Sequence, residues 1–165
     1  MQFSVLILLL TALVPLIVGF IWYNPKTFGN AWMKAAGVTP ESAQKANMAM
    51  VFGLTYVLGI FISFTLNSTV IHQNHIFSSL MHDNVFEAGS PAANYASEYM
   101  SKYGDRFRTF GHGLLHGMLL GITIALPVIG VNALFEQKGF KYIAINAGFW
   151  IVCMGIMGGI ICQFT

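Results

Sequence analysis

Four long intervals of this sequence contain no Asp, Glu, Lys or Arg, and this feature most constrains what the chain can fold into. The intervals are residues 2–24, 46–82, 109–135 and 142–165. A hydrocarbon core of about 30 Å is crossed by about 20 apolar residues of helix. Only 8% of the residues are charged, against about a quarter in soluble domains. The sequence therefore predicts an all-α integral membrane four-helix bundle, with the lipid bilayer as its surroundings.

The whole chain, residues 1–165, is expected to form a single transmembrane domain with an external loop over residues 71–107. The expected spans lie near residues 3–23, 48–69, 108–132 and 142–163. The first span lacks a basic flank before it and a small-residue cleavage site after it, so we expect a retained helix rather than a signal peptide.

Short interfacial helices are predicted in the first and second loops. In the first loop, Asn24 before Pro25 predicts a helix start and Gly37 its end, whereas Pro40 starts a helix expected to continue into the second span. In the second loop, the periodicity over residues 75–88 and the Ser-Pro start at residues 90–91 predict two helices lying on the membrane.

The basic residues are distributed unequally between the two sides of the predicted bundle. One side carries five, namely Lys26, Lys34, Lys45, Lys138 and Lys141. The other side carries three, namely Lys102, Arg106 and Arg108. Since cytoplasmic loops carry an excess of Lys and Arg, both termini are predicted to be external. A net charge of +2 is too small to indicate a nucleic-acid partner.

Glycines at intervals of four residues give the third and fourth spans smooth faces suited to close helix packing. These helix-packing candidates are Gly113, Gly117, Gly121, Gly155 and Gly159. Two interpretations remain open: association with a second copy or another membrane subunit, and packing within one four-helix monomer. Pro127, further along the third span, removes a backbone donor and predicts a kink.

His112 and His116 are spaced i, i+4 on the third span, so they share one helix face, as two metal ligands on a helix do. They could also relay protons or bind a haem axially. The alternative is a pair of neutral imidazoles that form hydrogen bonds across helices, to Thr55, Ser63 or Asn146. Because two ligands do not make a metal site, the sequence predicts no cofactor.

The outer loop supplies a second set of polar candidates and a stripe of aromatic residues. Side chains able to bind a divalent ion, or simply to remain solvated, lie on one face of the first loop helix: His72, His75, His82 and Asp83. Tyrosines at i, i+4, i+8 on the second loop helix are candidates for partner docking: Tyr95, Tyr99 and Tyr103.

The sequence contains no nucleophile–base pair, phosphate-binding glycine loop or carboxylate dyad. The leading hypothesis is therefore a non-enzymatic membrane protein that acts as an oligomer or as an accessory subunit of a larger membrane assembly. The alternatives are a small transporter or channel that uses the intramembrane histidines, and a haem- or metal-binding membrane redox component.

Several motifs resemble those of one known family. Gly19-Phe-Ile-Trp22-Tyr23-Asn-Pro25 leads to Phe28-Gly29-Asn-Ala-Trp32-Met33, and later come His116-Gly117, Leu126-Pro127, Asn132-Ala-Leu-Phe135-Glu136, Asn146-Ala-Gly148-Phe-Trp150 and Met157-Gly158. On these residues the chain resembles a bacterial membrane-protein family of unknown function, domain-of-unknown-function family 1761, over nearly its whole length apart from the outer loop. The resemblance implies a four-helix protein of the bacterial inner membrane and implies no activity.

Overall fold

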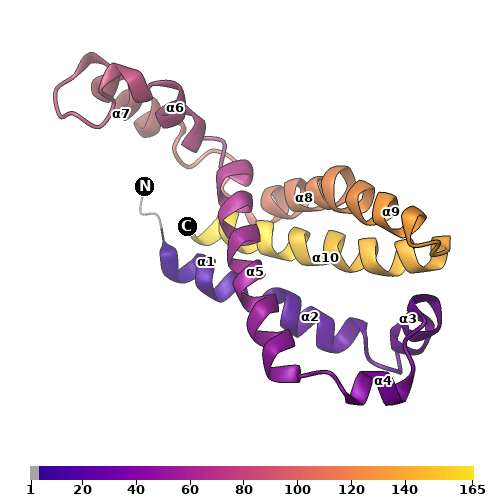
Figure 1. Cartoon of the computed structure of the whole chain (residues 1–165). Helices are drawn as coiled ribbons and strands as arrows, with labels where there is room; N and C mark the ends of the chain where they lie inside the picture. Colours follow the sequence, from indigo (N-terminus) through magenta and orange to yellow (C-terminus); the bar gives the residue numbers. More distant parts are fainter. Residues whose placement is uncertain (1–3) are drawn as a thin grey trace.

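The computed structural model describes residues 4–165, which form helices and no β-strand (Figure 1). The elements are α1 (Val5–Thr11), α2 (Val14–Trp22), α3 (Gly29–Ala36), α4 (Pro40–Gln44), α5 (Met48–Val70), α6 (Asn74–Ser79), the 3₁₀ turn η1 (Met81–Asp83), α7 (Pro91–Tyr103), α8 (Phe110–Leu120), the π-helical segment η2 (Gly121–Ala125), α9 (Leu126–Phe135) and α10 (Phe140–Phe164).

Four stretches are long and apolar enough to cross a membrane, which confirms the predicted fold class. They are Val5–Trp22, Met48–Val70, Phe110–Phe135 and Phe140–Phe164. Their bounds lie within a few residues of those predicted; residue 3, where the first span was expected to start, lies outside the described residues.

α10 is the central helix of the bundle. In Figure 1 it lies between α8–α9 on one side and α1–α2 on the other, and α5 crosses this layer. In the most apolar 18-residue stretch of α10, 56% is buried within the chain, against 11–28% in the corresponding stretches of the other three spans. The outer spans instead expose large apolar side chains, such as Phe20 and Phe61, as expected of surfaces that face lipid.

The main core lies where the end of α5 meets the end of α10 and the start of α1. Its buried members are Leu8, Val14, Leu66, Val70, Ile71, Met157, Ile161 and Cys162. Because the first and last spans both contribute to this core, the described ends of the chain lie on the same side of the bundle as the loop over residues 71–107.

The distortion expected at Pro127 takes the form of a π-helical segment. The N–H of Leu126 donates to the carbonyl of Gly121, five residues back. Since proline lacks an N–H and its ring crowds the carbonyl four residues before it, a widened turn ahead of Pro127 relieves this crowding without ending the helix.

The first loop departs from its predicted boundaries. α3 begins at Gly29 rather than Pro25, because the Thr27 hydroxyl turns back to the carbonyls of Ile21 and Trp22 and closes the end of α2. α3 ends as predicted at Gly37, which is left-handed with φ +76°.

The predicted continuation of the helix from Pro40 into the second span is wrong. α4 stops at Gln44, and α5 begins anew at Met48 with its own cap. The Asn47 side chain accepts a hydrogen bond from the N–H of Met50 at 3.1 Å, which favours a fresh helix start at this point.

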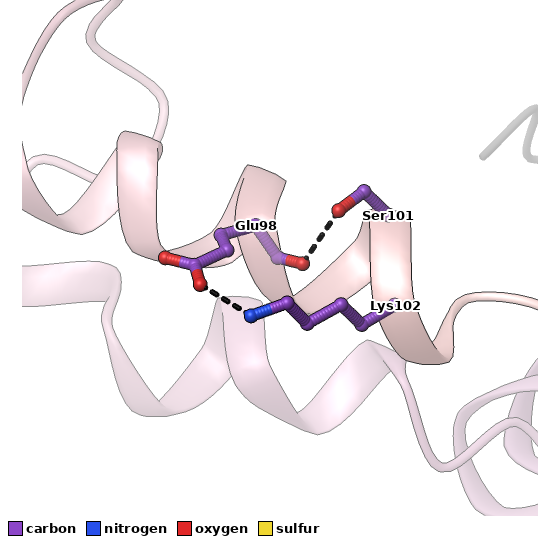
Figure 2. A network of polar contacts seen from close by, with 3 residues as sticks. All are labelled: Glu98, Ser101 and Lys102. Atoms are coloured by element: carbon purple, nitrogen blue, oxygen red, sulfur yellow. Dashed lines mark hydrogen bonds and ion pairs between the residues drawn. The ribbon is translucent and has the colours of Figure 1, made fainter.

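The second loop folds into a helical hairpin that projects beyond the end of α5 (Figure 1). Val85, Ala92 and Ala96 are buried between its helices, and Ile76 and Phe77 pack against them. On α7, Lys102 Nζ lies 2.6 Å from Glu98 Oε1, and the Ser101 hydroxyl donates to the Glu98 carbonyl (Figure 2). The second predicted helix starts at Pro91 as expected, whereas the first, expected over residues 75–88, ends at Ser79 and is followed only by the short turn η1. The sequence did not predict that the two helices pack against each other.

Candidate metal centre

Three histidines from two separate elements converge at the end of the bundle that carries the helical hairpin. The ligand nitrogens of His72, His112 and His116 all lie within 4.8 Å of one another. His72 Nε2 lies 3.0 Å from His112 Nε2, and the ring of His116 lies 4.9 Å from that of His72 and 4.4 Å from that of His112, centre to centre. The structure thus joins one histidine of the outer loop to the pair on the third span.

The first two turns of α8 position His112 and His116. The Thr109 hydroxyl caps this helix by accepting from the N–H of His112 at 3.3 Å. Gly113 and Gly117, each directly after a histidine, are buried against α10. Because the glycine face lies on α10, the neighbouring histidine face turns toward the end of α5.

The residues on either side hold His72 in place. Ile71 is fully buried in the main core. The buried Gln73 amide donates to the carbonyls of Tyr103, at 3.0 Å, and Arg106, at 2.7 Å. The end of α5 is therefore tied to the segment that leads from α7 into α8, which brings both ends of the outer loop to the same level.

The ring of Phe107 lies against one member of the histidine cluster, His112. It stacks on His112 with ring centres 5.1 Å apart and planes 20° apart. Its backbone has φ +60°, a left-handed conformation that costs a bulky residue energy. Its carbonyl accepts from the Cys162 thiol at 3.3 Å and from the N–H of Thr109 at 2.8 Å, and these two bonds hold the conformation.

The surroundings of His72 favour its neutral imidazole. Partial burial lowers the pKa of His72, and the neighbouring His116 and His75 lower this pKa further. Neutral imidazole is the form that binds metal. Arg108, the nearest cation in sequence to the cluster, is engaged elsewhere, with the carbonyls of Cys162 and Thr165.

The donor set matches a small transition-metal ion. Imidazole suits zinc, copper, iron and nickel, and three histidines with one open position form a known zinc ligand set. Zinc–nitrogen bonds of about 2.0–2.1 Å in tetrahedral geometry place the nitrogens about 3.3 Å apart. The observed separations, from 3.0 Å to at most 4.8 Å, bracket that value.

The structure does not unite the other predicted ligands. His75, His82 and Asp83 do not join the cluster, which is the one group of three or more potential metal ligands found in residues 4–165. The predicted hydrogen bond across helices is present for His112, whose Nε2 pairs with His72 Nε2, but the three partners named for it are wrong. Thr55 donates to Val51, Ser63 donates to Gly59, and the Asn146 amide donates to Tyr142.

The glycine faces of the third and fourth spans meet within the chain. A Cβ atom on Gly113 would lie 2.1 Å from the Gly158 carbonyl oxygen, and one on Gly117 would lie 2.0 Å from that of Met154. Gly121 abuts Ile151 in the same way. On α10, Gly155 faces Met118 and Leu114, and Gly159 faces Phe110. These faces are therefore filled by intramolecular packing.

The tyrosine stripe lies on the hairpin. Tyr99 and Tyr103 pack ring to ring with centres 5.1 Å apart, and the Arg106 guanidinium lies 4.8 Å from the ring centre of Tyr103. Tyr95 is 60% exposed.

Comparison with known proteins identifies a family without assigning an activity. The family model described as "Protein of unknown function (DUF1761)" matches residues 6–162, which include the helical hairpin and all three histidines. No curated protein and no solved structure matches the chain. The match spans nearly the entire sequence, so the chain belongs to the DUF1761 family of proteins of unknown function.

Proposed function

We propose that this membrane protein binds one divalent transition-metal ion of the zinc class through His72, His112 and His116. The observation that carries this proposal is the convergence of three imidazoles, from the turn after α5 and the start of α8, within 4.8 Å. Residues 40 positions apart meet here because the loop between them is pinned at both ends. Partial burial lowers the pKa of His72, which favours the neutral imidazole that binds metal.

The position of the cluster discriminates between the alternatives drawn from the sequence. The histidines lie at one end of the bundle, which supports a binding site rather than a proton relay across the membrane. Three imidazoles whose ligand nitrogens lie within 4.8 Å of one another suit a single ion better than a haem, whose two axial ligands approach from opposite faces of the ring.

Two further parts of the proposal are the side of the membrane that the histidines face and the surface that a partner subunit would bind. With five of the eight basic residues on the opposite side, the histidines face the outside of a bacterial inner membrane. A role as an accessory subunit now depends on Tyr95, Tyr99 and Tyr103, because the glycine faces are filled within the chain.

Cobalt titration tests the metal site. The untagged protein is purified in mild detergent, stripped with a chelator and titrated with Co²⁺, whose four-coordinate complexes absorb strongly in the visible range. We expect one equivalent to bind and Zn²⁺ to displace it. Each of His72→Gln, His112→Gln and His116→Gln should weaken binding by at least about tenfold, because loss of even an outer-shell partner costs that much.

His82→Gln is the matched control, because it removes an exposed imidazole of the same outer loop that lies outside the cluster and does not act on the pKa of His72. This variant should bind cobalt as the wild type does. Equal affinity in the wild type and all three cluster variants would refute the assignment, and so would a wild-type protein that binds no stoichiometric cobalt.

A further inference from the structure

A cavity lies at the end of the bundle opposite the histidines. It has a volume of about 380 Å³ and lies between α3 and the start of α10, lined by Ala31, Lys34, Ala35, Gly139, Lys141 and Tyr142. We propose that this cavity binds the phosphate headgroup of an anionic phospholipid, held by the ammonium groups of Lys34 and Lys141.

Both ammonium groups are available to a ligand. Within residues 4–165 the only ion pair joins Lys102 to Glu98 on the distant hairpin (Figure 2). In the same residues, the side chains of Lys34 and Lys141 donate no hydrogen bond, unlike that of Lys138. Glu136, at the end of α9, is exposed and forms no ion pair with them. Two unneutralised cations on one cavity favour an anionic occupant.

The cavity is preformed because α3 is fixed to α10 on both sides of it. Asn146 Oδ1 accepts from the Tyr23 hydroxyl at 3.1 Å and from Trp32 Nε1 at 3.2 Å. Lys138 Nζ donates to the Ala36 carbonyl at 2.7 Å, at the end of α3. The third nearby ammonium therefore serves the structure of the wall, which leaves Lys34 and Lys141 for the ligand.

The surrounding aromatic residues place the cavity at headgroup depth. Trp22, Tyr23, Trp32 and Tyr142 gather around α3 and the start of α10, and such rings favour the membrane–water boundary. The alanines of α3 offer an apolar wall to the glycerol region of a lipid. In addition, no side chain caps the start of α10 at Gly139, and the partial positive charge of this end reinforces the two lysines.

The cavity lies on the side of the membrane where anionic lipids are expected. This end carries five of the eight basic residues and is therefore predicted to face the cytoplasm, where the leaflet surface is negative. Basic pockets between transmembrane helices on that side bind acidic headgroups. A free phosphate shares the same chemistry, but only a lipid is held at this depth by the membrane itself.

Lipid retention measured by native mass spectrometry tests the proposal. The full chain is reconstituted in nanodiscs containing equal amounts of phosphatidylglycerol and phosphatidylcholine, released, and scored for the lipid that stays bound. We expect one phosphatidylglycerol to be retained preferentially. The preference should fall roughly fivefold for each of Lys34→Gln and Lys141→Gln, and further in the double variant.

The matched control is the double variant Lys26→Gln/Lys45→Gln, which removes the same charge from the same side but not from the cavity. It should keep the preference, and all variants should elute and show helicity as the wild type does. An equal loss in the control would show general attraction to the membrane and overturn the site. Inorganic phosphate in excess should not displace the lipid; displacement would overturn the lipid assignment in favour of a soluble anion.

Discussion

Replacing Gly117 with alanine tests whether close contact between α8 and α10 holds the bundle together. A Cβ atom at this position would lie 2.0 Å from the Met154 carbonyl oxygen, 2.7 Å from its carbonyl carbon and 3.0 Å from the Gly155 Cα. All three are backbone atoms of α10, so no side chain can rotate away. The two helices must separate by about 1 Å or more for the methyl group to reach ordinary contact distance.

The expected magnitude combines two opposing effects. Overpacking a tight interface costs about 1–3 kcal/mol, and loss of contacts along the separated helices adds to this. Alanine regains about 1 kcal/mol through its higher helix propensity. We therefore expect Gly117→Ala to lower the free energy of unfolding by about 1–2 kcal/mol. Gly130 is also helical but has nothing within 4 Å of its Cβ position, so Gly130→Ala should stabilise by up to about 1 kcal/mol.

Thermal unfolding in detergent, followed by helicity, compares the two variants. A difference of about 2 kcal/mol corresponds to roughly 4–8 °C between their midpoints in a chain of this size. The cobalt spectrum gives a second readout, because a displaced α8 also moves His112 and His116 away from His72. If Gly117→Ala proved as stable as Gly130→Ala, the inference that these glycines are packed within the chain would be refuted.

Three further changes probe the anchors and the metal site. Asn146→Leu should destabilise the protein by about 1–3 kcal/mol, because the Tyr23 hydroxyl and Trp32 Nε1 lose their shared acceptor. A red shift of tryptophan emission should accompany this loss of stability. Unchanged emission and stability would contradict the anchoring role of Asn146. Phe107→Gly should release bound cobalt to a chelator faster without lowering thermal stability, because glycine adopts φ +60° freely while the ring over His112 is lost; an unchanged release rate would show that the ring does not shield the site. Zinc at about 100 times the dissociation constant of the wild type should raise the free energy of unfolding of the wild type by about 2.7 kcal/mol. The same zinc concentration should raise that of His112→Gln by less, and equal shifts in both proteins would place the ion elsewhere.

The sequence predicted the transmembrane class because charge is a local property of each segment. A stretch such as residues 142–165, with no Asp, Glu, Lys or Arg, is predicted to span the membrane from its own composition, independently of the rest of the chain. The left-handed end of α3 at Gly37 was predictable for the same reason, since glycine alone suits that conformation without strain. The start of α3 was not, because it depends on Thr27 reaching back to the end of another helix.

The metal centre shows where sequence reasoning stopped. The i, i+4 spacing placed His112 and His116 on one face, but two ligands make no site. His72 was assigned to a different surface, together with His75 and His82. One signal could have united them: His72 directly follows the end of the second span and His112 lies near the start of the third, so both belong at the same membrane level. Phe107 gave no signal, because its left-handed backbone is set by bonds to Cys162 and Thr109.

The sequence alone therefore determined that this chain forms four helices apolar enough to span a membrane. It also determined which predicted side carries more basic residues and which residues share a helix face. Tertiary structure alone decided what those faces meet. The glycines could have served a second copy, but the backbone of α10 fills them. This close contact turns the histidine face of α8 toward the end of α5, and the Gln73 bonds hold the third imidazole there. Periodicity along one helix does not encode its rotation against a neighbour, and that rotation makes three separate histidines one site.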